Sequence, residues 1–228
     1  MQKKWGKTVN IVIMCVLVPL TVYLGATFFG EKQYAWISLC VAILSCVPFF
    51  IRFERRDNDV RRLVLIAVMV ALSAAGRFVF APVPGFKPVT AMVAVTAMYF
   101  GPEAGFMTGA LTAVISNFYF GQGPWTPFQM FAWGIIGFII GLIAEPLKHS
   151  KFLLILSGII AGVGFSLLMD VWSTLYADGT FNLMRYFLFV VSSLQVMVIY
   201  AVSNVVFLLV LSKPIGKIFE RIKVKYGM

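Results

Sequence analysis

Long apolar stretches, separated by short polar or Gly/Pro-containing segments, recur along the whole chain. Each is predicted to form a membrane-spanning helix, since a span needs about 20 apolar residues in a row. Eight are expected, at 9–29, 34–51, 63–80, 88–100, 103–119, 127–144, 152–176 and 184–211. The stretch 88–100 is the shortest. A helix of this length covers only about 20 Å of a hydrocarbon core about 30 Å thick.

Composition supports a polytopic helical membrane protein. Of the 228 residues, 61% are hydrophobic and 12% are charged, whereas soluble domains have about 45–50% and about 25%. The three cysteines, Cys15, Cys40 and Cys46, lie inside apolar stretches without CxxC spacing. This position favours small buried side chains over a disulfide or a metal site. The expected fold class is therefore an all-α membrane protein.

The formal net charge of +10 comes from Lys and Arg residues that cluster at the ends of the apolar stretches. This distribution predicts a membrane topology rather than nucleic-acid binding. The first apolar stretch is expected to be a retained helix, because it is long for a signal peptide and has no small-residue cleavage site. The positive-inside rule then predicts a multi-pass protein with eight spans and both termini in the cytoplasm. Only Lys32, Arg77, Lys87 and Arg185 lie on or near the outer side.

The polar run RFERRDNDVRR at 52–62 divides the chain into two predicted domains. Residues 1–56 form an N-terminal transmembrane hairpin, and residues 57–228 form a six-helix unit. The outward connections of this unit are 80–88, 120–126 and 177–182. Irregular Gly/Pro backbone near a membrane is tolerated only where protein buries it or water solvates it. The loops therefore predict a structured cavity that opens to the outside.

Three ionisable side chains lie within the predicted spans or at their outer ends: Arg77, Asp170 and Arg185. Such groups are costly in a membrane and are functional candidates by default. Each arginine either snorkels to the interface or donates to an anionic or amide-rich ligand. Asp170 lies deeper and needs a partner, which is either one of these arginines or the ligand.

The stretch NFYFGQGPWTPFQMF, residues 117–131, carries more aromatic and amide side chains than a simple connection needs. Trp125 is the favoured ligand contact, because a flexible glycine and two prolines hold it in place. An interfacial aromatic belt explains more than half of the aromatic residues at the outer level, which are Phe86, Tyr119, Trp125, Trp133, Trp172 and Tyr176. The amides Asn117, Gln122 and Gln129 either join helices or contact a ligand.

Small residues at four-residue spacing recur in four sets: Ala67/Ala71/Ala75, Gly101/Gly105/Gly109, Gly137/Gly141 and Gly158/Gly162. Small side chains let membrane helices approach closely. Packing within the chain is expected to explain most of these sets. One set remains a candidate face for another membrane subunit.

Several functional classes lack their motifs in this sequence. There is no GxxxxGK[ST] loop, so the chain is not expected to hydrolyse ATP itself. No acidic or histidine relay crosses the spans, which weighs against a proton- or sodium-driven carrier. The lone histidine, His149, lies on a predicted cytoplasmic loop, and no HExxH motif or serine-triad context appears. The chain is therefore not expected to be an enzyme, and no catalytic residue or metal ligand is predicted.

Two features of the six-helix unit are similar to one known family. They are the AxxxA motif at Ala67 and Ala71 and the run GFKPVTAMVAVTAMYFGPEAGFMTGALTAVISNFYFGQGPWTPFQMFAWGIIGFIIGL. Both resemble the S-components of energy-coupling factor (ECF) vitamin transporters, which are the substrate-binding subunits of ABC-type importers in bacterial cell membranes. The resemblance covers about residues 60–212. Within the family, FGQGPWTPFQMFAWG is most similar to the branch assigned to cobalamin (vitamin B12).

The resemblance implies a six-helix protein that captures a vitamin from outside, with cobalamin as the transported ligand and no cofactor of its own. It implies a pocket closed by loops 81–88, 120–126 and 177–183. Gly85, Gly121 and Gly123 would let these loops move aside. The N-terminal hairpin departs from the six-helix core of the family.

The resemblance also implies partners. The protein would dock on a transmembrane coupling subunit (EcfT-type) that carries two cytoplasmic ATPases (EcfA-type), which use the ATP, and would then topple in the membrane to release the vitamin inside. Ala67 and Ala71 match the docking motif of the family, and Ala75 overlaps it in register.

The residues expected to contact the vitamin lie on or near the outward loops: Arg77, Phe86, Lys87, Asn117, Tyr119, Gln122, Trp125, Gln129, Asp170, Trp172, Tyr176 and Arg185. His149 is on the wrong side to coordinate the cobalt of cobalamin. The alternatives within the family are another vitamin and a cobalamin precursor such as dimethylbenzimidazole. The alternatives from other classes are a stand-alone secondary carrier and a membrane assembly factor.

Overall fold

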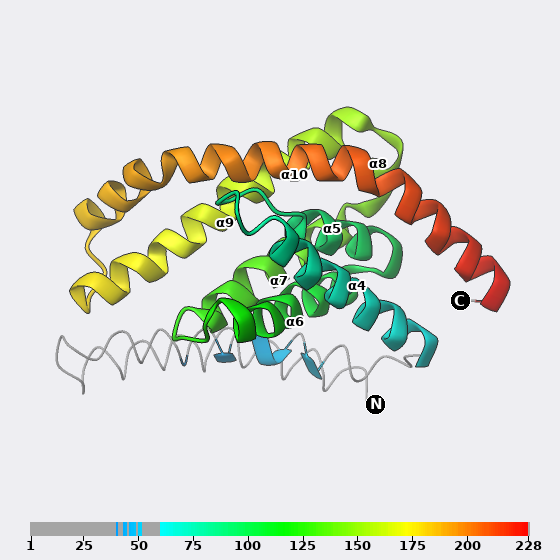
Figure 1. Cartoon of the computed structure of the whole chain (residues 1–228), viewed down its shortest axis with the longest axis horizontal. Helices are drawn as coiled ribbons and strands as arrows, with labels where there is room; N and C mark the ends of the chain where they lie inside the picture. The colour runs from blue at the N-terminus through cyan, green and yellow to red at the C-terminus, as the bar shows by residue number, and fades with distance from the viewer. Residues whose placement is uncertain (1–39, 41–42, 45, 49, 52–59, 228) are drawn as a thin grey trace.

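The computed structural model describes residues 40, 43–44, 46–48, 50–51 and 60–227. The first predicted span, part of the second, and residues 52–59 of the linker lie outside these residues. Figure 1 labels the helices α4 (Val60–Val79), α5 (Val89–Phe100), α6 (Pro102–Phe120), α7 (Thr126–Leu142), α8 (Ala144–His149), α9 (Lys151–Asp178) and α10 (Leu183–Tyr226). The described part of the chain contains no strand, in agreement with the predicted all-α class.

The six spans predicted for the second unit correspond to α4, α5, α6, α7, α9 and α10, each of which begins within three residues of its predicted start. Two predictions on the side expected to face the cytoplasm were wrong. A bare loop was expected at 145–151, but α8 forms there, with Pro146 in its first turn and Leu147 buried. A proline in the first turn of a helix costs no hydrogen bond.

The last helix was expected to end at 211, but α10 continues to Tyr226 through Pro214. A proline inside a helix removes one backbone hydrogen bond. The turns beyond it are held by packing, since Phe219 is buried against the rings of Tyr99 and Phe100. The Nζ of Lys223 also donates to the carbonyl of Tyr99. Tertiary contacts therefore continue the helix past the proline and past the end of the apolar stretch.

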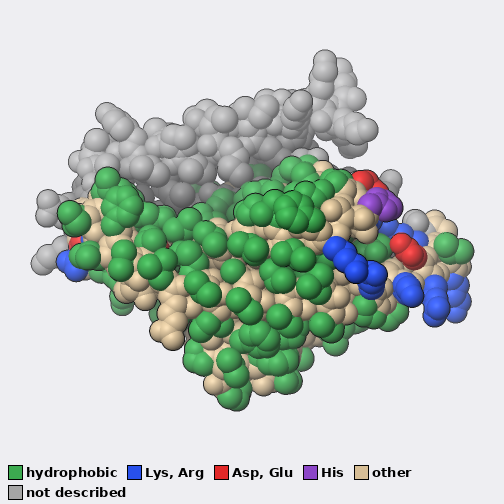
Figure 2. All heavy atoms as spheres, turned by 90° about the horizontal axis from the view of Figure 1, so that it is seen from above, with side chains coloured by type: hydrophobic (Ala, Val, Ile, Leu, Met, Phe, Trp, Pro, Cys, Tyr) green, Lys and Arg blue, Asp and Glu red, His purple; other side chains and the backbone are tan. Residues whose placement is uncertain are grey.

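Three of the described helices, α4, α9 and α10, are long and apolar enough to cross a membrane, and α5 and α7 are shorter apolar helices. The total of eight spans and the cytoplasmic position of both termini stay predictions. Figure 2 shows a face covered largely by hydrophobic side chains, with most of its Lys and Arg gathered at one end beside the histidine. This distribution is typical of a protein whose middle lies in lipid and whose end meets water.

The short helix α5 lies at the centre of the bundle. Eleven of its twelve residues are buried, and it contacts every other helix from α4 to α10. A helix that is apolar all round is expected to be buried. Because protein surrounds α5, its length does not have to match the thickness of the bilayer.

Glycines bring two pairs of helices into close contact. A Cβ built on Gly105 of α6 would lie 2.8 Å from the carbonyl oxygen of Gly137 on α7, and one on Gly162 of α9 would lie 2.7 Å from the backbone nitrogen of Ala201 on α10. Both distances are too short for a real side chain. The prediction that most small-residue sets pack within the chain is confirmed at these contacts. The set on α4 differs, because Ala67, Ala71 and Ala75 are all exposed.

The described residues of the second predicted span pack against α6. The ring of Phe50 meets that of Phe106 edge-on at 6.4 Å, and Cys46 is buried in the same cluster. Cys40 is exposed, and both cysteines are free thiols, whereas Cys15 lies outside the described residues. Among those residues, no group of His, Cys, Asp or Glu side chains is placed to hold a metal ion.

Candidate functional site

A hydrogen-bond network joins the ends of three helices, with Asn117 of α6 at its centre. Arg77, in the last turn of α4, donates from Nη1 to the Oγ of Ser116 at 2.5 Å and to the Oδ1 of Asn117 at 2.8 Å. The Nδ2 of Asn117 then donates to Thr126 Oγ1 at 2.9 Å and to Gln129 Oε1 at 2.7 Å, both on α7. Asn117 is 1% exposed, so its amide makes its hydrogen bonds with other groups of the protein.

Lys87 enters the same region from the loop before α5. Its Nζ donates to the hydroxyl of Tyr200 on α10 at 2.9 Å. Its backbone N–H donates to the Oγ of Ser203 at 2.8 Å, and that hydroxyl donates to the Lys87 carbonyl at 3.0 Å. Burial lowers the pKa of Lys87, Tyr200 partly opposes this change, and the positive charge of Arg77 lowers the pKa further. Loop 80–88 is thus fixed to α10 with its lysine turned inward.

The buried ring of Trp133 on α7 connects the two cations. Its centroid lies 5.3 Å from the Cζ of Arg77 and 5.5 Å from the Nζ of Lys87. Phe165 of α9 stacks on this ring at 4.8 Å, and Tyr200 meets Phe165 edge-on at 5.4 Å. Contacts between a cation and an aromatic face each contribute about 0.5–2 kcal/mol. Side chains from α4, loop 80–88, α7, α9 and α10 therefore converge on one point.

The two cations at Trp133 have no carboxylate partner in the described part of the chain. The ion pairs there are Lys148–Glu145, His149–Glu145 and Arg185–Asp178. Around the cations, the buried hydroxyls of Ser73 and Thr112 are without hydrogen-bond partners among the described residues. Ser73 lies one helical turn before Arg77, and Thr112 one turn before Ser116, so each shares a face with a member of the network. The site is rich in donors and poor in negative charge.

The loop after α6 uses its polar side chains to hold its own shape. The Nε2 of Gln122 donates to the carbonyl of Val114 at 2.8 Å, and its Oε1 accepts from Thr126 Oγ1 at 3.0 Å. Gly121 has a φ of +99°, which favours glycine. A Cβ on Gly123 would lie 2.3 Å from the ring of Trp125. These glycines thus have conformational reasons to be there, and the gating role assigned to Gly85, Gly121 and Gly123 stays a prediction.

The hypothesis of an ion pair between Asp170 and an arginine was wrong. The Oδ2 of Asp170 accepts from the Oγ of Ser193 on α10 at 2.7 Å. Arg185 instead pairs with Asp178 at 3.0 Å, across the turn between α9 and α10. Asp170 is 7% exposed, so its carboxyl group stays buried between these two helices, and a contact with the ligand remains a prediction.

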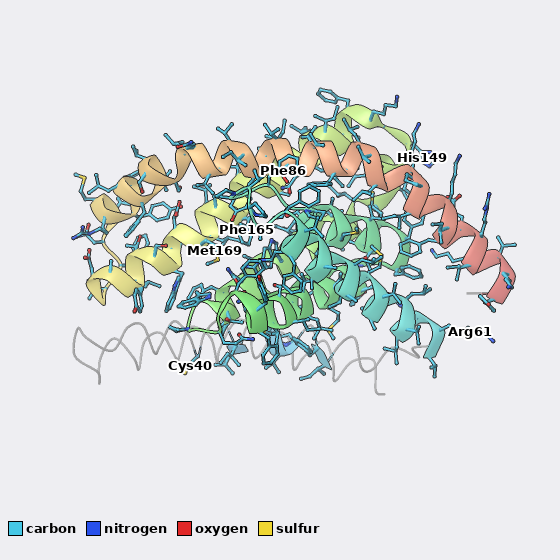
Figure 3. All side chains as sticks on the ribbon, viewed as in Figure 1. Cys40, Arg61, Phe86, His149, Phe165 and Met169 are labelled. Atoms are coloured by element: carbon cyan, nitrogen blue, oxygen red, sulfur yellow. The ribbon has the colours of Figure 1, made fainter. Side chains whose placement is uncertain are left out.

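The aromatic candidates divide between the core and the surface. Trp172 is buried between the rings of Phe128 and Tyr176, and Phe86 packs with core phenylalanines. Tyr119 and Tyr176 are 73% and 64% exposed. Figure 3 places Phe86 and Phe165 in the middle of the molecule, whereas His149 and Arg61 lie toward the end that carries the C-terminus.

The structure therefore unites part of the predicted site. Arg77, Lys87, Asn117 and Gln129 lie in the networks around Trp133, whereas Tyr119 and Arg185 make their contacts elsewhere. The partners of these residues, which were not predicted from the sequence, are Ser116, Thr126, Phe165 and Tyr200. Ser116 lies directly before the stretch 117–131, next to Asn117, and Thr126 lies within it, next to Trp125. Phe165 and Tyr200 are single aromatic residues in long apolar helices, which carry no distinguishing signal.

An all-helical membrane protein with buried polar groups between its helices has the features of a membrane protein that binds a polar ligand. Comparison with family models identifies its class. The chain belongs to the family described as ECF-type riboflavin transporter, S component, whose model matches residues 57–221. The resemblance of the sequence to ECF S-components is confirmed, and the chain is a membrane-embedded transporter subunit that binds substrate.

The curated relatives are similar over part of the chain. A UPF0397 protein of Vibrio atlanticus is 29% identical over 136 residues, which are 52% of this chain and 73% of that protein. UPF0397 proteins of Aliivibrio fischeri and Aliivibrio salmonicida are 31% identical over 87 residues, which are 36% of this chain and 47% of each relative. No solved structure matches the chain. These names mention no vitamin, and the family description names riboflavin, so the cobalamin branch is not confirmed.

Proposed function

We propose that this protein captures cobalamin from outside the cell and delivers it through an ECF complex. Membership of the S-component family supports the general function. The observation that carries the proposal is the convergence of Arg77, Lys87 and Asn117 around Trp133. A membrane protein does not bring two half-buried cations and a buried amide together without a function or a partner, because each is costly to remove from water.

Cobalamin fits this arrangement by its chemistry. The rim of its corrin ring carries amide side chains, and its nucleotide loop carries a phosphodiester. Amide carbonyls and phosphate oxygens accept hydrogen bonds from the types of group that Arg77, Lys87 and Gln129 present. The similarity of residues 120–134 to the cobalamin branch adds a second line of support.

Riboflavin is the second candidate, because the description of the matching family names it. Its flat ring system suits contacts with aromatic side chains, and its hydroxyl chain suits the amides of Asn117 and Gln129. Riboflavin carries no negative charge at neutral pH, so it would leave the two cations at Trp133 without a counter-charge.

The partner surface is proposed to be the exposed face of α4 that contains Ala67, Ala71 and Ala75. Family membership implies association with a transmembrane coupling subunit and its ATPases. Small residues permit the close approach that helix packing in membranes requires. Gly105 on α6, Gly137 on α7 and Gly162 on α9 already face other helices of this chain, whereas the three alanines are exposed. Toppling in the membrane and uptake energised by the ATPases complete the proposal.

Two measurements test the proposed function. Isothermal titration of the purified protein with cobalamin, riboflavin and a panel of other vitamins is expected to give tight binding of cobalamin by the isolated chain. Absence of tight cobalamin binding would contradict the choice of vitamin. Reconstitution in liposomes is expected to give uptake only with the coupling subunit, both ATPases and ATP. Uptake by the chain alone under a pH or sodium gradient would identify a secondary carrier instead.

A further inference from the structure

The two cations at Trp133 indicate the charge of the ligand. We propose that Arg77 and Lys87 together bind a negatively charged oxygen group of the ligand, a carboxylate or a phosphate, and so make the protein prefer vitamins that carry such a group over vitamins that lack one. This inference rests on the proposed function and deepens it, since it names a chemical class that the comparisons leave open.

The first support is unused donor capacity. A guanidinium has five N–H donors and an ammonium has three. The hydrogen bonds of Arg77 with described residues all use Nη1, and the ammonium of Lys87 donates to the Tyr200 hydroxyl. The remaining donors of both side chains have no acceptor among the described residues. An anionic oxygen group can accept several such bonds at once, and bonds of this kind are about twice as strong as neutral ones.

The second support is the proximity of two like charges. The charge of Arg77 acts on Lys87 and disfavours its protonated form. Like charges in a buried region repel each other more strongly than in water, because the local dielectric is low. The contacts of both cations with the Trp133 ring compensate only in part. A negative group placed between them would remove the repulsion and restore the protonated form of Lys87.

The third support is the pair of buried hydroxyls beside the network. Ser73 and Thr112 are each 0% exposed, and neither hydroxyl has a partner among the described residues. A buried donor without an acceptor costs about 1–3 kcal/mol, so such groups call for an explanation. Ser73 lies on the face of α4 that carries Arg77, one helical turn away.

A purely structural role for the cations makes a different prediction. If Arg77 and Lys87 only held helices together, neutral variants would lose stability and would bind charged and uncharged ligands equally poorly. The discriminating quantity is therefore the preference for the member of a matched ligand pair that carries a negative phosphate group, called the charged member below, over the member without one, called the uncharged member. Two pairs serve: riboflavin 5′-phosphate with riboflavin, and cobalamin with cobinamide, which lacks the nucleotide loop and its phosphodiester.

The experiment titrates both pairs into wild type, Lys87→Gln, Arg77→Gln and the control Lys151→Gln. Lys151 is exposed at the start of α9, so this variant loses the same charge away from the site. Wild type and the control are expected to bind the charged member of at least one pair about tenfold to a hundredfold more tightly, as for hydrogen bonds to a charged group. Lys87→Gln and Arg77→Gln are both expected to lose that preference, whatever each substitution does to the affinity for the uncharged member.

The other results are also decisive. Equal binding of both members by wild type, or an unchanged preference in Lys87→Gln and Arg77→Gln, overturns the inference but leaves vitamin capture intact. If neither pair binds, the ligand that copurifies with the protein is identified by mass spectrometry. A vitamin without a carboxylate or phosphate group overturns the inference, and one that carries such a group and is lost in Lys87→Gln upholds it. Failure to bind any vitamin overturns the proposed function itself. Thermal melting of each variant excludes misfolding.

Discussion

Arg77 donates to the Oδ1 of Asn117 at 2.8 Å, although the two residues lie 40 positions apart in the chain. The bond ties the last turn of α4 to the end of α6, and Asn117 passes the connection on to α7. Along its outer surface, α4 also carries the exposed alanines of the proposed docking face. One helix therefore contributes both to the candidate ligand site and to the surface that a coupling subunit would contact.

Two substitutions of Asn117 distinguish the effect of an added negative charge on ligand binding from the effect of lost hydrogen bonds on stability. Asn117→Asp keeps an acceptor for Arg77, and the amide of Gln129 can turn to donate to the new carboxylate. The added negative charge is expected to weaken binding of cobalamin about tenfold or more, because it competes with the phosphate for Arg77. Thermal stability in detergent is expected to stay close to that of wild type.

Asn117→Leu is the matched structural variant. It leaves Arg77, Thr126 and Gln129 without their shared partner, at a cost of about 1–3 kcal/mol for each group that stays unpaired. Its melting temperature is expected to fall by several degrees. Titration calorimetry and thermal melting of both variants check the pair. Unchanged cobalamin affinity in a folded Asn117→Asp would show that the ligand presents no negative group here.

Sequence patterns located the helices well because length and hydropathy are local properties. The starts of α5, α6, α7, α9 and α10 lie within one residue of their predicted positions. The end of α10 was missed because the apolar stretch ends at 211, whereas the packing of Phe219 against α5 sustains the helix beyond it. The six-residue α8 was missed because one and a half turns show no periodicity.

The candidate site was predictable only in part, for a different physical reason. Arg77 and Asn117 were identifiable because polar groups in apolar helices are costly and therefore conspicuous. Their meeting around Trp133 depends on how α4, α6 and α7 pack, which sequence spacing does not encode. Asp170 illustrates the limit, since its charge predicted either an arginine or the ligand as partner, but the fold supplies Ser193.

Close packing of α6 on α7 predicts an unequal response to two glycine substitutions. A Cβ on Gly137 would lie 2.6 Å from the backbone carbonyl group of Gly105, so Gly137→Ala must push the helices apart. The free energy of unfolding is expected to fall by about 1–3 kcal/mol, as for overpacked cores. Gly164→Ala is the control, because nothing lies within 4 Å of its Cβ position. Equal denaturation curves for the two variants would contradict this packing.

The docking face predicts loss of transport without loss of binding. Ala71→Trp places a large ring on the exposed face of α4 and is expected to reduce ATP-dependent uptake to background in liposomes that contain the whole complex. Cobalamin affinity is expected to change by less than about twofold, as for a surface substitution. Ile160→Trp adds the same ring at a site on α9 that is 61% exposed and should transport normally. Parallel loss of binding and uptake in Ala71→Trp would indicate misfolding.

The lowered pKa of Lys87 predicts opposite effects of alkaline pH on ligand binding and on stability. Lys87 loses its proton at a pH below the ordinary lysine value of 10.5, because burial and the charge of Arg77 disfavour the ammonium. An anionic ligand needs the charged form. The affinity for cobalamin is therefore expected to fall as pH rises through the lowered pKa, by at most about tenfold per pH unit.

The stability of the ligand-free protein changes with the opposite sign. Between the lowered pKa of the folded state and 10.5, the unfolded chain binds the proton that the folded protein has lost. The contribution of Lys87 to the free energy of unfolding therefore rises with pH in that window. Titrations and melting curves at a series of alkaline pH values check both trends against Lys87→Gln, which should show neither. Affinity that stays constant up to pH 10.5 in wild type would rule out an ionised Lys87 as a contact of the ligand.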